Sequence, residues 1–369
     1  MIYLDYSATT PVDPEVAKHL AKVASSIYAN PNSMHRLGEE ARKAIEQATN
    51  HIKDILHIVN HQIVYTSGAT EANNLAIFGY CHQHQSHGKH IIVSPYEHSS
   101  TIACFSTLEL QGFEVDMLGV KPDGLIDLDE LKSLLREDTI FVSIAKVNSE
   151  TGITQDLHAI REVIKPYPWI ALHSDMTQAI GKIEPDFHDV DLASFSAHKF
   201  YGLKGIGALM IRDGITIQPQ IVGGKSLTNL RSGTPATPLI LSLSYALERA
   251  YLHEEKKRAR VHSLHDLLIT ELQKMPHVVI NSTANSIPHI VNVSFVGNDA
   301  KWVQTKLNDH DIFVSTQSAC SSQTSMSVLI YRMTGSEDLA KSAIRISISH
   351  LTTEMEIHHF VKILKEVLL

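Results

Sequence analysis

The chain has 369 residues, a formal net charge of −8 at pH 7 and a hydrophobic content of 43%. The length predicts two domains and the hydrophobic content allows a sizeable core, while the acidic balance argues against stable binding to DNA or RNA. No segment approaches the length of a membrane span, and the opening residues MIYLDYSATT lack a signal-peptide pattern. We therefore expect no direct nucleic-acid partner and no membrane partner.

The sequence holds only three cysteines, Cys81, Cys104 and Cys320, and they form no CxxC pair. A sparse and odd set without a signal peptide argues against a disulfide framework and for a reducing compartment. We expect a cytoplasmic protein in which any functional cysteine acts as a free thiol.

Histidines are frequent, with 23 in the chain, and they are densest in CHQHQSHGKH at 81–90. This stretch lies between a helical pattern and an apolar strand, and it lacks a regular ligand spacing supported by carboxylates. We expect a solvated loop there and predict no metal site.

Apolar strands and helical patterns alternate through the first two thirds of the chain. A short strand and a turn precede a helix that begins near Pro14, an amphipathic helix covers 39–56, and 61–80 is typical of a strand, a tight turn and a helix. Further strands are predicted at 90–94, 113–119, 139–147, 169–175, 191–197 and 207–212, with helices at 100–112, 128–137 and 158–165. This alternation predicts an α/β layer around a mostly parallel sheet that is buried on both faces.

The pattern changes after about residue 237. Residues 237–275 are typical of one long helix, and they are followed by strands near 289–297, 312–315 and 343–349, a helix at 299–309 and a closing helix from 354. The second part of the chain is therefore expected to form a smaller α+β domain.

The segment 191–212, DLASFSAHKFYGLKGIGALMIR, places Lys199 between two apolar runs and next to a glycine-rich turn. An ordinary lysine titrates near ~10.4, but desolvation and a neighbouring cation lower that pKa and make a Schiff-base nucleophile. His198 and Lys204 are the neighbours to consider. Taken alone, the segment favours a structural lysine at the edge of a strand beside a glycine hairpin.

Other polar residues also begin where a predicted strand ends, and ligands of open α/β sheets collect at that edge. His98, Asn148, Asp175 and Gln178 follow such strands. The segment 66–70 leads into a helix, so the backbone N–H groups of Ala69 and Thr70 are expected to form an anion site at its positive end.

A phosphate cradle, a carboxylate, an imidazole and an amine at one sheet edge match the needs of pyridoxal phosphate. A nucleotide-dependent dehydrogenase is the alternative for an α/β chain, but the sequence has neither a G-x-G-x-x-G nor a Walker motif in the required place.

Motifs along nearly the whole chain also carry a resemblance to a known family. They are LDYSATTPVDPEV, TSGATEANNLAI, PYEHSS, HSDMTQAIGK, SFSAHKFYGLKGIGAL, RSGT and STQSACSS. In this order they resemble the cysteine desulfurases of the class V aminotransferase family, which have pyridoxal-phosphate fold type I. The resemblance implies a large domain at 14–250 with a mostly parallel seven-stranded sheet flanked by helices, and a small domain at 1–13 and 251–369.

The resemblance also assigns roles to the matching residues. Lys199 would form the Schiff base with the cofactor, Asp175 would pair with its ring nitrogen, and Gln178 would bind its ring hydroxyl. His98 would stack on the ring and assist proton transfer. The phosphate would be held by Ala69, Thr70, Ser196 and His198, and in the partner subunit of a homodimer by Thr234. Asn148, Arg345 and Asn30 would bind the substrate.

Cys320 lies in the polar stretch STQSACSSQTSM, and a free thiol there needs only a modest fall in pKa to act as a thiolate. The resemblance implies that Cys320 takes sulfur from L-cysteine as a persulfide, releases L-alanine and passes the sulfur to an acceptor protein for iron–sulfur clusters or for thiolation of tRNA or a cofactor. A selenocysteine lyase or aminotransferase, or a weakly active sulfur-transfer scaffold, are the alternatives.

The chain departs from the family pattern at four places. Met176 replaces the usual alanine after the ring-pairing aspartate, Ser149 replaces an asparagine, Ala29 replaces a glycine, and TSMSVLIYRM follows the Cys320 motif in place of the usual Glu-Pro-Ser stretch. The question raised by Met176 is whether its longer side chain lies against the cofactor.

Overall fold

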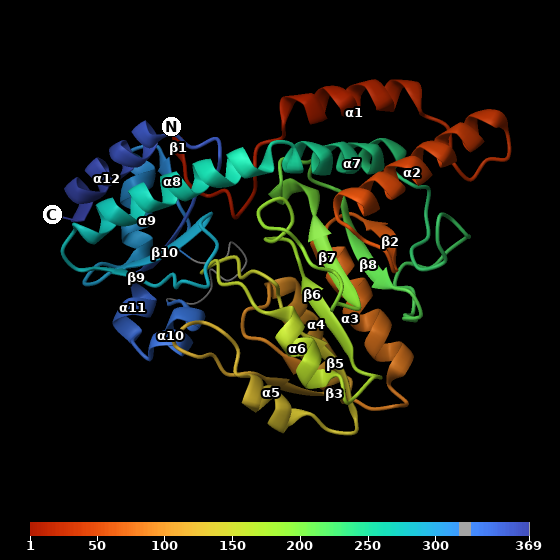
Figure 1. Cartoon of the computed structure of the whole chain (residues 1–369), viewed down its shortest axis with the longest axis horizontal. Helices are drawn as coiled ribbons and strands as arrows, with labels where there is room; N and C mark the ends of the chain where they lie inside the picture. Colours follow the sequence, from red (N-terminus) through yellow and green to blue (C-terminus); the bar gives the residue numbers. More distant parts are fainter. Residues whose placement is uncertain (317–325, 369) are drawn as a thin grey trace.

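The structure is a computed structural model that describes residues 1–316 and 326–368. Within this part of the chain, a seven-stranded sheet forms the centre of the molecule (Figure 1). Its strands, in spatial order, are β2 (His61–Thr66), β8 (Gly207–Arg212), β7 (Leu192–Ser196), β6 (Ala171–Asp175), β5 (Thr139–Ser143), β3 (His90–Val93) and β4 (Glu114–Met117).

The sheet is mostly parallel, as the sequence predicted. Strands β4, β3, β5, β6 and β7 run parallel to one another, and β8 runs antiparallel to both of its neighbours. Every residue of β5, β6 and β7 is buried, as expected for strands covered by helices on both faces.

Helices cover both faces of this sheet (Figure 1). Helices α3 (Ala69–His84) and α4 (Ser99–Leu110) share one apolar cluster with the sheet. The other face packs against a larger cluster that includes residues of α2 (Arg36–Ile55), α5 (Leu128–Leu134), α6 (Leu157–Ile164) and α7 (Thr237–Tyr251). Helix α1 (Pro14–Ser26) lies along α7. Successive residues of β8 alternate between the two clusters, because side chains of a strand point to opposite faces.

A smaller α+β unit lies beside the large sheet and has its own apolar cluster. Among the described residues it contains the pair β1 (Ile2–Tyr3) and β11 (Ile312–Phe313) and an antiparallel sheet of β12 (Ala343–Ser347), β10 (Ile290–Phe295) and β9 (Val278–Ile280). Its helices are α8 (Glu254–Gln273), α9 (Ala300–Asp309), α10 (Val328–Thr334), α11 (Glu337–Lys341) and α12 (Glu354–Leu368). The domain limits at residues 13 and 250 stay a prediction.

The prediction of one long helix over 237–275 is wrong. The chain forms α7 and α8, and His253 between them adopts a left-handed backbone conformation with φ of 58°. The apolar periodicity continues across this break because each helix packs on a different core, α7 on the large sheet and α8 on the small unit. A helical pattern alone does not reveal that its two halves serve separate cores.

The prediction of a loop over 81–90 is only partly right. Helix α3 continues through His84, and Cys81 is buried within it. The His82 and His84 rings bond outside the helix, to the side chain of Gln111 and the carbonyl of Thr216. Among the described residues, no group of three or more histidines, cysteines or carboxylates is arranged to hold a metal ion. No helix in the same residues is long and apolar enough to cross a bilayer.

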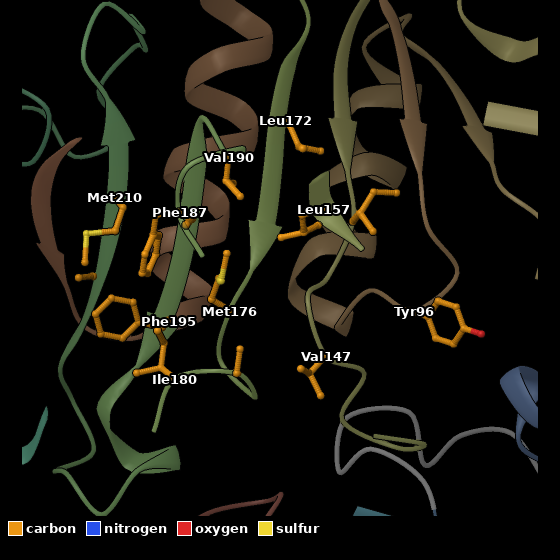
Figure 2. Packing of buried hydrophobic residues seen from close by; sticks show 14 of the residues in the cluster. Tyr96, Val147, Leu157, Leu172, Met176, Ile180, Phe187, Val190, Phe195 and Met210 are labelled. Carbon is orange, nitrogen blue, oxygen red and sulfur yellow. The ribbon is translucent and has the colours of Figure 1, made fainter. Parts of the chain in front are cut away.

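Met176 directly follows β6, is fully buried in the larger apolar cluster and is not among the described residues that line the cavity at the carboxyl edge of the sheet. Figure 2 shows its side chain together with Ile180, Val190 and Phe195, which belong to the same cluster. Asp175 precedes it on β6 and points to the other side, because side chains alternate along a strand. The longer side chain at this position therefore fills the core.

We predict that Met176→Ala destabilises the protein by about 2–5 kcal/mol, because it leaves a cavity in a closely packed cluster. Urea unfolding followed by circular dichroism would measure the change. Met355→Ala is the control, since Met355 is 78% exposed and its truncation is expected to cost less than about 0.5 kcal/mol. Equal effects of the two substitutions would contradict the assignment of Met176 to the core.

Candidate active site

A cavity of about 440 Å³ lies at the carboxyl ends of β5, β6 and β7. It brings together nine of the residues that the sequence predicted for the site: Ala69, Thr70, His98, Asp175, Gln178, Ser196, His198, Lys199 and Arg345. They come from separate strands, helices and loops, and Arg345 comes from β12 of the small unit. The cavity therefore depends on both parts of the chain.

The start of helix α3 forms one wall of the cavity. No side chain of a described residue caps its N-terminus at Gly68, and the N–H groups of its first turn have no partner within the helix. Gly207 allows the close approach of β8, because a Cβ at this position would lie 2.7 Å from the Gly68 Cα. Ser196 ends β7 opposite this turn, so a hydroxyl and the helix start face a common point suited to a phosphate.

Lys199 ends the short 3-10 turn Ala197–Lys199 that follows β7. Its Nζ donates hydrogen bonds to the carbonyl oxygens of Ser7 at 2.7 Å and Ala8 at 2.8 Å. Residues 5–13, which we call the N-terminal strap, thus hold the amine in the cavity. Ser7 and Ala8 were not identified from the sequence as site residues, because every residue has a backbone carbonyl and the residue type does not reveal its use as an acceptor.

The N-terminal strap is fastened to the turn around Lys199 by several further bonds. The Thr10 N–H and hydroxyl both donate to the His198 carbonyl at 2.9 and 3.0 Å, and the Tyr201 N–H donates to the Thr10 hydroxyl at 2.7 Å. The His198 ring pairs with the Thr9 hydroxyl at 3.0 Å. These bonds fix the strap and the lysine turn as one assembly.

Asp175 supplies a buried carboxylate at the end of β6. One of its oxygens accepts from the Asn73 amide at 3.0 Å and the other from the Thr177 N–H at 2.9 Å. The two bonds fix the orientation of the carboxyl group. Asn73 lies on α3 and was not identified from the sequence as part of the site.

Gln178 and His98 both line the same cavity. The Gln178 amide donates to the Ser7 carbonyl at 2.9 Å, whereas its Oε1 is buried without a hydrogen-bond partner among the described residues. Such an atom is expected to meet a polar group of a ligand. The His98 ring pairs with the Ser100 hydroxyl at 2.8 Å, and burial lowers its pKa, which favours the neutral ring.

Positive groups are gathered behind Lys199. Lys182 is fully enclosed and donates to the Lys199 carbonyl at 3.2 Å, and burial followed by the charge of Lys199 lowers its pKa to about 7. Burial, followed by the charges of Lys199, Lys204 and Lys182, lowers the pKa of His198 to about 4. The sequence analysis considered His198 and Lys204 as neighbours of the amine but missed Lys182, which is distant in sequence.

Arg345 is 1% exposed and is held by an acidic partner that the sequence analysis also missed. Its guanidinium donates to the Asp5 carboxylate at 2.7 Å and to the Ser149 carbonyl at 2.9 Å, while its Nε has no partner among the described residues. Asp5 also accepts from the Ser315 hydroxyl at 2.9 Å. This arrangement orients a buried cation at the cavity, as binding of a carboxylate requires.

Two of the predicted substrate-binding residues are not among the described residues that line the cavity. The Asn148 oxygen accepts bonds from the N–H groups of Glu150 and Thr151, and its amide donates to the Tyr96 carbonyl at 3.1 Å. Asn30 is exposed, and its side chain accepts from the Asn32 N–H. Their roles toward substrate stay predictions.

Two further predicted residues lie away from this cavity or outside the described structure. Thr234 is exposed and lines a second cavity of about 660 Å³ that shares Ser67 and Gly205 with the first. Cys320 lies outside the described residues.

Comparison with known proteins agrees with this geometry. The family model described as "Aminotransferase class-V" matches residues 2–360. The chain belongs to the class V aminotransferase family. Its similar curated relatives include "Cysteine desulfurase IscS" of Serratia proteamaculans, which is 40% identical over 99% of this chain and 92% of the relative.

Solved structures related to this class V chain have the same fold. A "NIFS-LIKE PROTEIN" superposes with a TM-score of 0.92 at 32% identity, covering 100% of this chain and 99% of that one. "SspA in complex with cysteine" superposes with a TM-score of 0.83, also at 32% identity, covering 96% and 100%. The predicted fold class is confirmed, including the small unit beside the mostly parallel sheet.

Enzymes of this family use pyridoxal 5′-phosphate, which confirms the cofactor predicted from the sequence. The residues of the cavity fit this molecule. Among the described residues, the cavity offers an uncapped helix start for the phosphate, a buried carboxylate for the ring nitrogen, and the unpartnered oxygen of Gln178 for the ring hydroxyl.

The ion pair of Asp5 and Arg345 yields a prediction about stability. Asp5→Ala should destabilise the protein by about 3–5 kcal/mol, because it leaves the buried guanidinium without its counter-ion. Urea unfolding would measure the loss. Glu337→Ala is the control, since the pair of Glu337 and Lys341 is more than half exposed on the glutamate side and should be worth at most about 1 kcal/mol.

Proposed function

We propose that this class V enzyme is a cysteine desulfurase that converts L-cysteine to L-alanine and places the sulfur on Cys320. The observation that carries the proposal is the cavity in which Lys199, Asp175 and Arg345 meet. It offers an amine, a carboxylate and a carboxylate-binding cation within about 440 Å³, a volume suited to a cofactor with one small amino acid. The named relatives support the choice of substrate.

Lys199 is proposed to bind the cofactor's aldehyde and, once cysteine has replaced it, to move the Cα proton. When bound, pyridoxal phosphate supplies an electron sink that stabilises negative charge at the substrate Cα. The strap carbonyls of Ser7 and Ala8 give the released amine defined hydrogen-bond acceptors. His98, whose lowered pKa favours a neutral ring, can take and return a proton near neutral pH.

Binding of the cofactor and substrate is assigned to the remaining predicted residues. The first-turn N–H groups of Ala69 and Thr70, with Ser196 and His198, would hold the phosphate, and Gln178 would bind the ring hydroxyl. Arg345 would bind the substrate carboxylate, with the sequence-based assignments of Asn148 and Asn30 alongside it. Asp175 would keep the ring nitrogen protonated.

The sulfur transfer is balanced without an external oxidant or reductant. The Cys320 thiolate attacks the substrate sulfur, an S–S bond forms, and the Cβ–S bond breaks with its electron pair left on carbon. Cβ and Cα then take up protons, so one L-cysteine and one thiol give one L-alanine and one persulfide. Cys320 is assigned this role from the sequence. The other two cysteines are poorly suited to it, because burial raises the pKa of the Cys104 thiol to about 12 and raises that of Cys81 as well.

A homodimer is proposed in which Thr234 of one subunit completes the phosphate site of the other. Two features support this assignment: Thr234 is exposed, and its cavity shares Ser67 and Gly205 with the cofactor cavity. The persulfide would be passed to an acceptor protein in the cytoplasm, for assembly of iron–sulfur clusters or thiolation of tRNA or a cofactor.

Incubation with L-cysteine and a thiol reductant tests the reaction. The purified enzyme should release alanine and sulfide in equal amounts, and without reductant Cys320 should gain one sulfur atom by peptide mass analysis. Cys320→Ser should lower turnover at least roughly a thousandfold, the range for loss of a nucleophile. Cys104→Ala is the control and should retain activity, because the high pKa of this thiol keeps it protonated.

The outcome also separates the alternatives. Formation of a keto acid, or turnover that does not need Cys320, would contradict desulfuration and favour an aminotransferase or a selenocysteine lyase. Cofactor binding with negligible turnover in the presence of reductant would favour a scaffold.

Cofactor attachment is a separate prediction. Lys199→Ala should lose the visible absorption band of the bound cofactor, because no other amine replaces the covalent link. Lys182→Ala is the control for the nearby buried amine and should retain the band. A visible band that survives in Lys199→Ala but disappears in Lys182→Ala would contradict this prediction and assign the attachment to Lys182.

A further inference from the structure

A chain of buried hydrogen bonds continues from Asp175 into the protein, on the side away from the cavity. It passes through Asn73 on α3, Ser194 on β7, His173 on β6 and Ser143 on β5. All four side chains are 0% exposed. Burying polar groups of this kind destabilises the folded protein unless their hydrogen bonds are satisfied.

With a neutral His173 ring, the chemistry of the groups assigns the donor of each bond in this chain. The Asn73 amide nitrogen donates to Asp175, so its oxygen is left to accept, and the Ser194 hydroxyl donates to it. Since the single proton of Ser194 is used, its oxygen can only accept from the His173 Nε2–H at 3.4 Å. The His173 Nδ1 then has no proton and accepts from the Ser143 hydroxyl at 2.9 Å.

The far end of the chain reaches the Glu97 carboxyl group, which interacts with the Ser143 hydroxyl. Glu97 accepts from the Ser94 hydroxyl at 2.8 Å and the Ala145 N–H at 2.6 Å. Burial raises the pKa of Glu97 to about 8, and burial lowers the pKa of His173 to about 4. Both groups are therefore mainly neutral at pH 7.

We propose that Asn73, Ser194 and His173 form a polarised relay that orients the Asp175 carboxylate toward the cofactor ring. The inference rests on the proposed role of Asp175 as partner of the ring nitrogen. The three are positioning residues, because each acts through Asp175 and none lines the cavity among the described residues. Within the row only the Asn73 amide donates to the carboxylate, and Ser194 and His173 act through Asn73.

The first test reads the relay directly in the holoenzyme. ¹⁵N nuclear magnetic resonance of the imidazole, assigned by the signal lost in His173→Asn, should report a neutral ring protonated at Nε2 throughout pH 6–8. A ring protonated at Nδ1, or a positively charged ring at pH 7, would overturn the proposal.

The second test measures what the relay does to the bound cofactor. Ser194→Ala removes the donor to Asn73, so Asp175 is held less firmly toward the ring nitrogen, and that nitrogen is less often protonated. The pH midpoint of the cofactor's visible band should then rise by up to about one unit, because a protonated ring nitrogen is a nearby like charge that lowers this midpoint. Ser194→Thr keeps the hydroxyl and should restore the original midpoint.

His90→Asn is the matched control for loss of a buried histidine in the same sheet. His90 begins β3, at the end opposite the cavity, and pairs with the Thr139 hydroxyl and the Asp116 carboxylate. Its substitution should leave the midpoint unchanged. A midpoint in Ser194→Ala that moves no more than in His90→Asn would overturn the relay.

Neither measurement uses L-cysteine, so failure of the relay and failure of the proposed function can be told apart. A holoenzyme with the expected midpoint shift and no desulfuration would contradict the function and retain the relay. Desulfuration with an unshifted midpoint in Ser194→Ala would support the function and contradict the relay. If Ser194→Ala does not fold, the imidazole spectrum of the unaltered enzyme still decides.

Discussion

Burial of β5, β6 and β7 on both faces confines polar chemistry to the ends of these strands. Their interior residues are covered by helices, so a charged group can meet a ligand only where a strand stops. Asp175 ends β6 and Lys199 follows β7, so adjacent parallel strands place a carboxylate and an amine in one cavity. The other residues of the site orient this carboxylate and this amine.

The N-terminal strap shows how a distant segment completes such a site. It starts at the small unit, where β1 pairs with β11, and it crosses to the large sheet before α1 begins. On the way its carbonyl oxygens accept from Lys199 and Gln178. Asp5 near its start pairs with Arg345. The strap thereby couples the position of the amine to that of the buried Arg345 guanidinium across the two parts of the chain.

Two layers of polar groups therefore surround the proposed cofactor. The inner layer lines the cavity. Several of its side chains were recognised at the ends of predicted strands, whereas Arg345 and the role of Ser196 were expected only from the family resemblance. The outer layer includes Lys182, Asn73 and His173, which are buried and act on the inner layer through charge or hydrogen bonds. Their environment has a low effective dielectric constant, so their electrostatic influence on Lys199 and Asp175 is greater than it would be at the surface.

The sequence by itself determined the fold class, the cofactor and most of the inner layer, because these depend on local periodicity and on residues at strand ends. Lys199, Asp175 and His98 could be placed at one edge once the strands were taken to be parallel. Only the tertiary structure decided which side chains oppose them. Met176 lies in the core because alternation along β6 turns it away from Asp175, and α7 ends where its partner surface changes. Asp5 and Arg345 are 340 residues apart, and such pairings follow from chain packing, which no local pattern encodes.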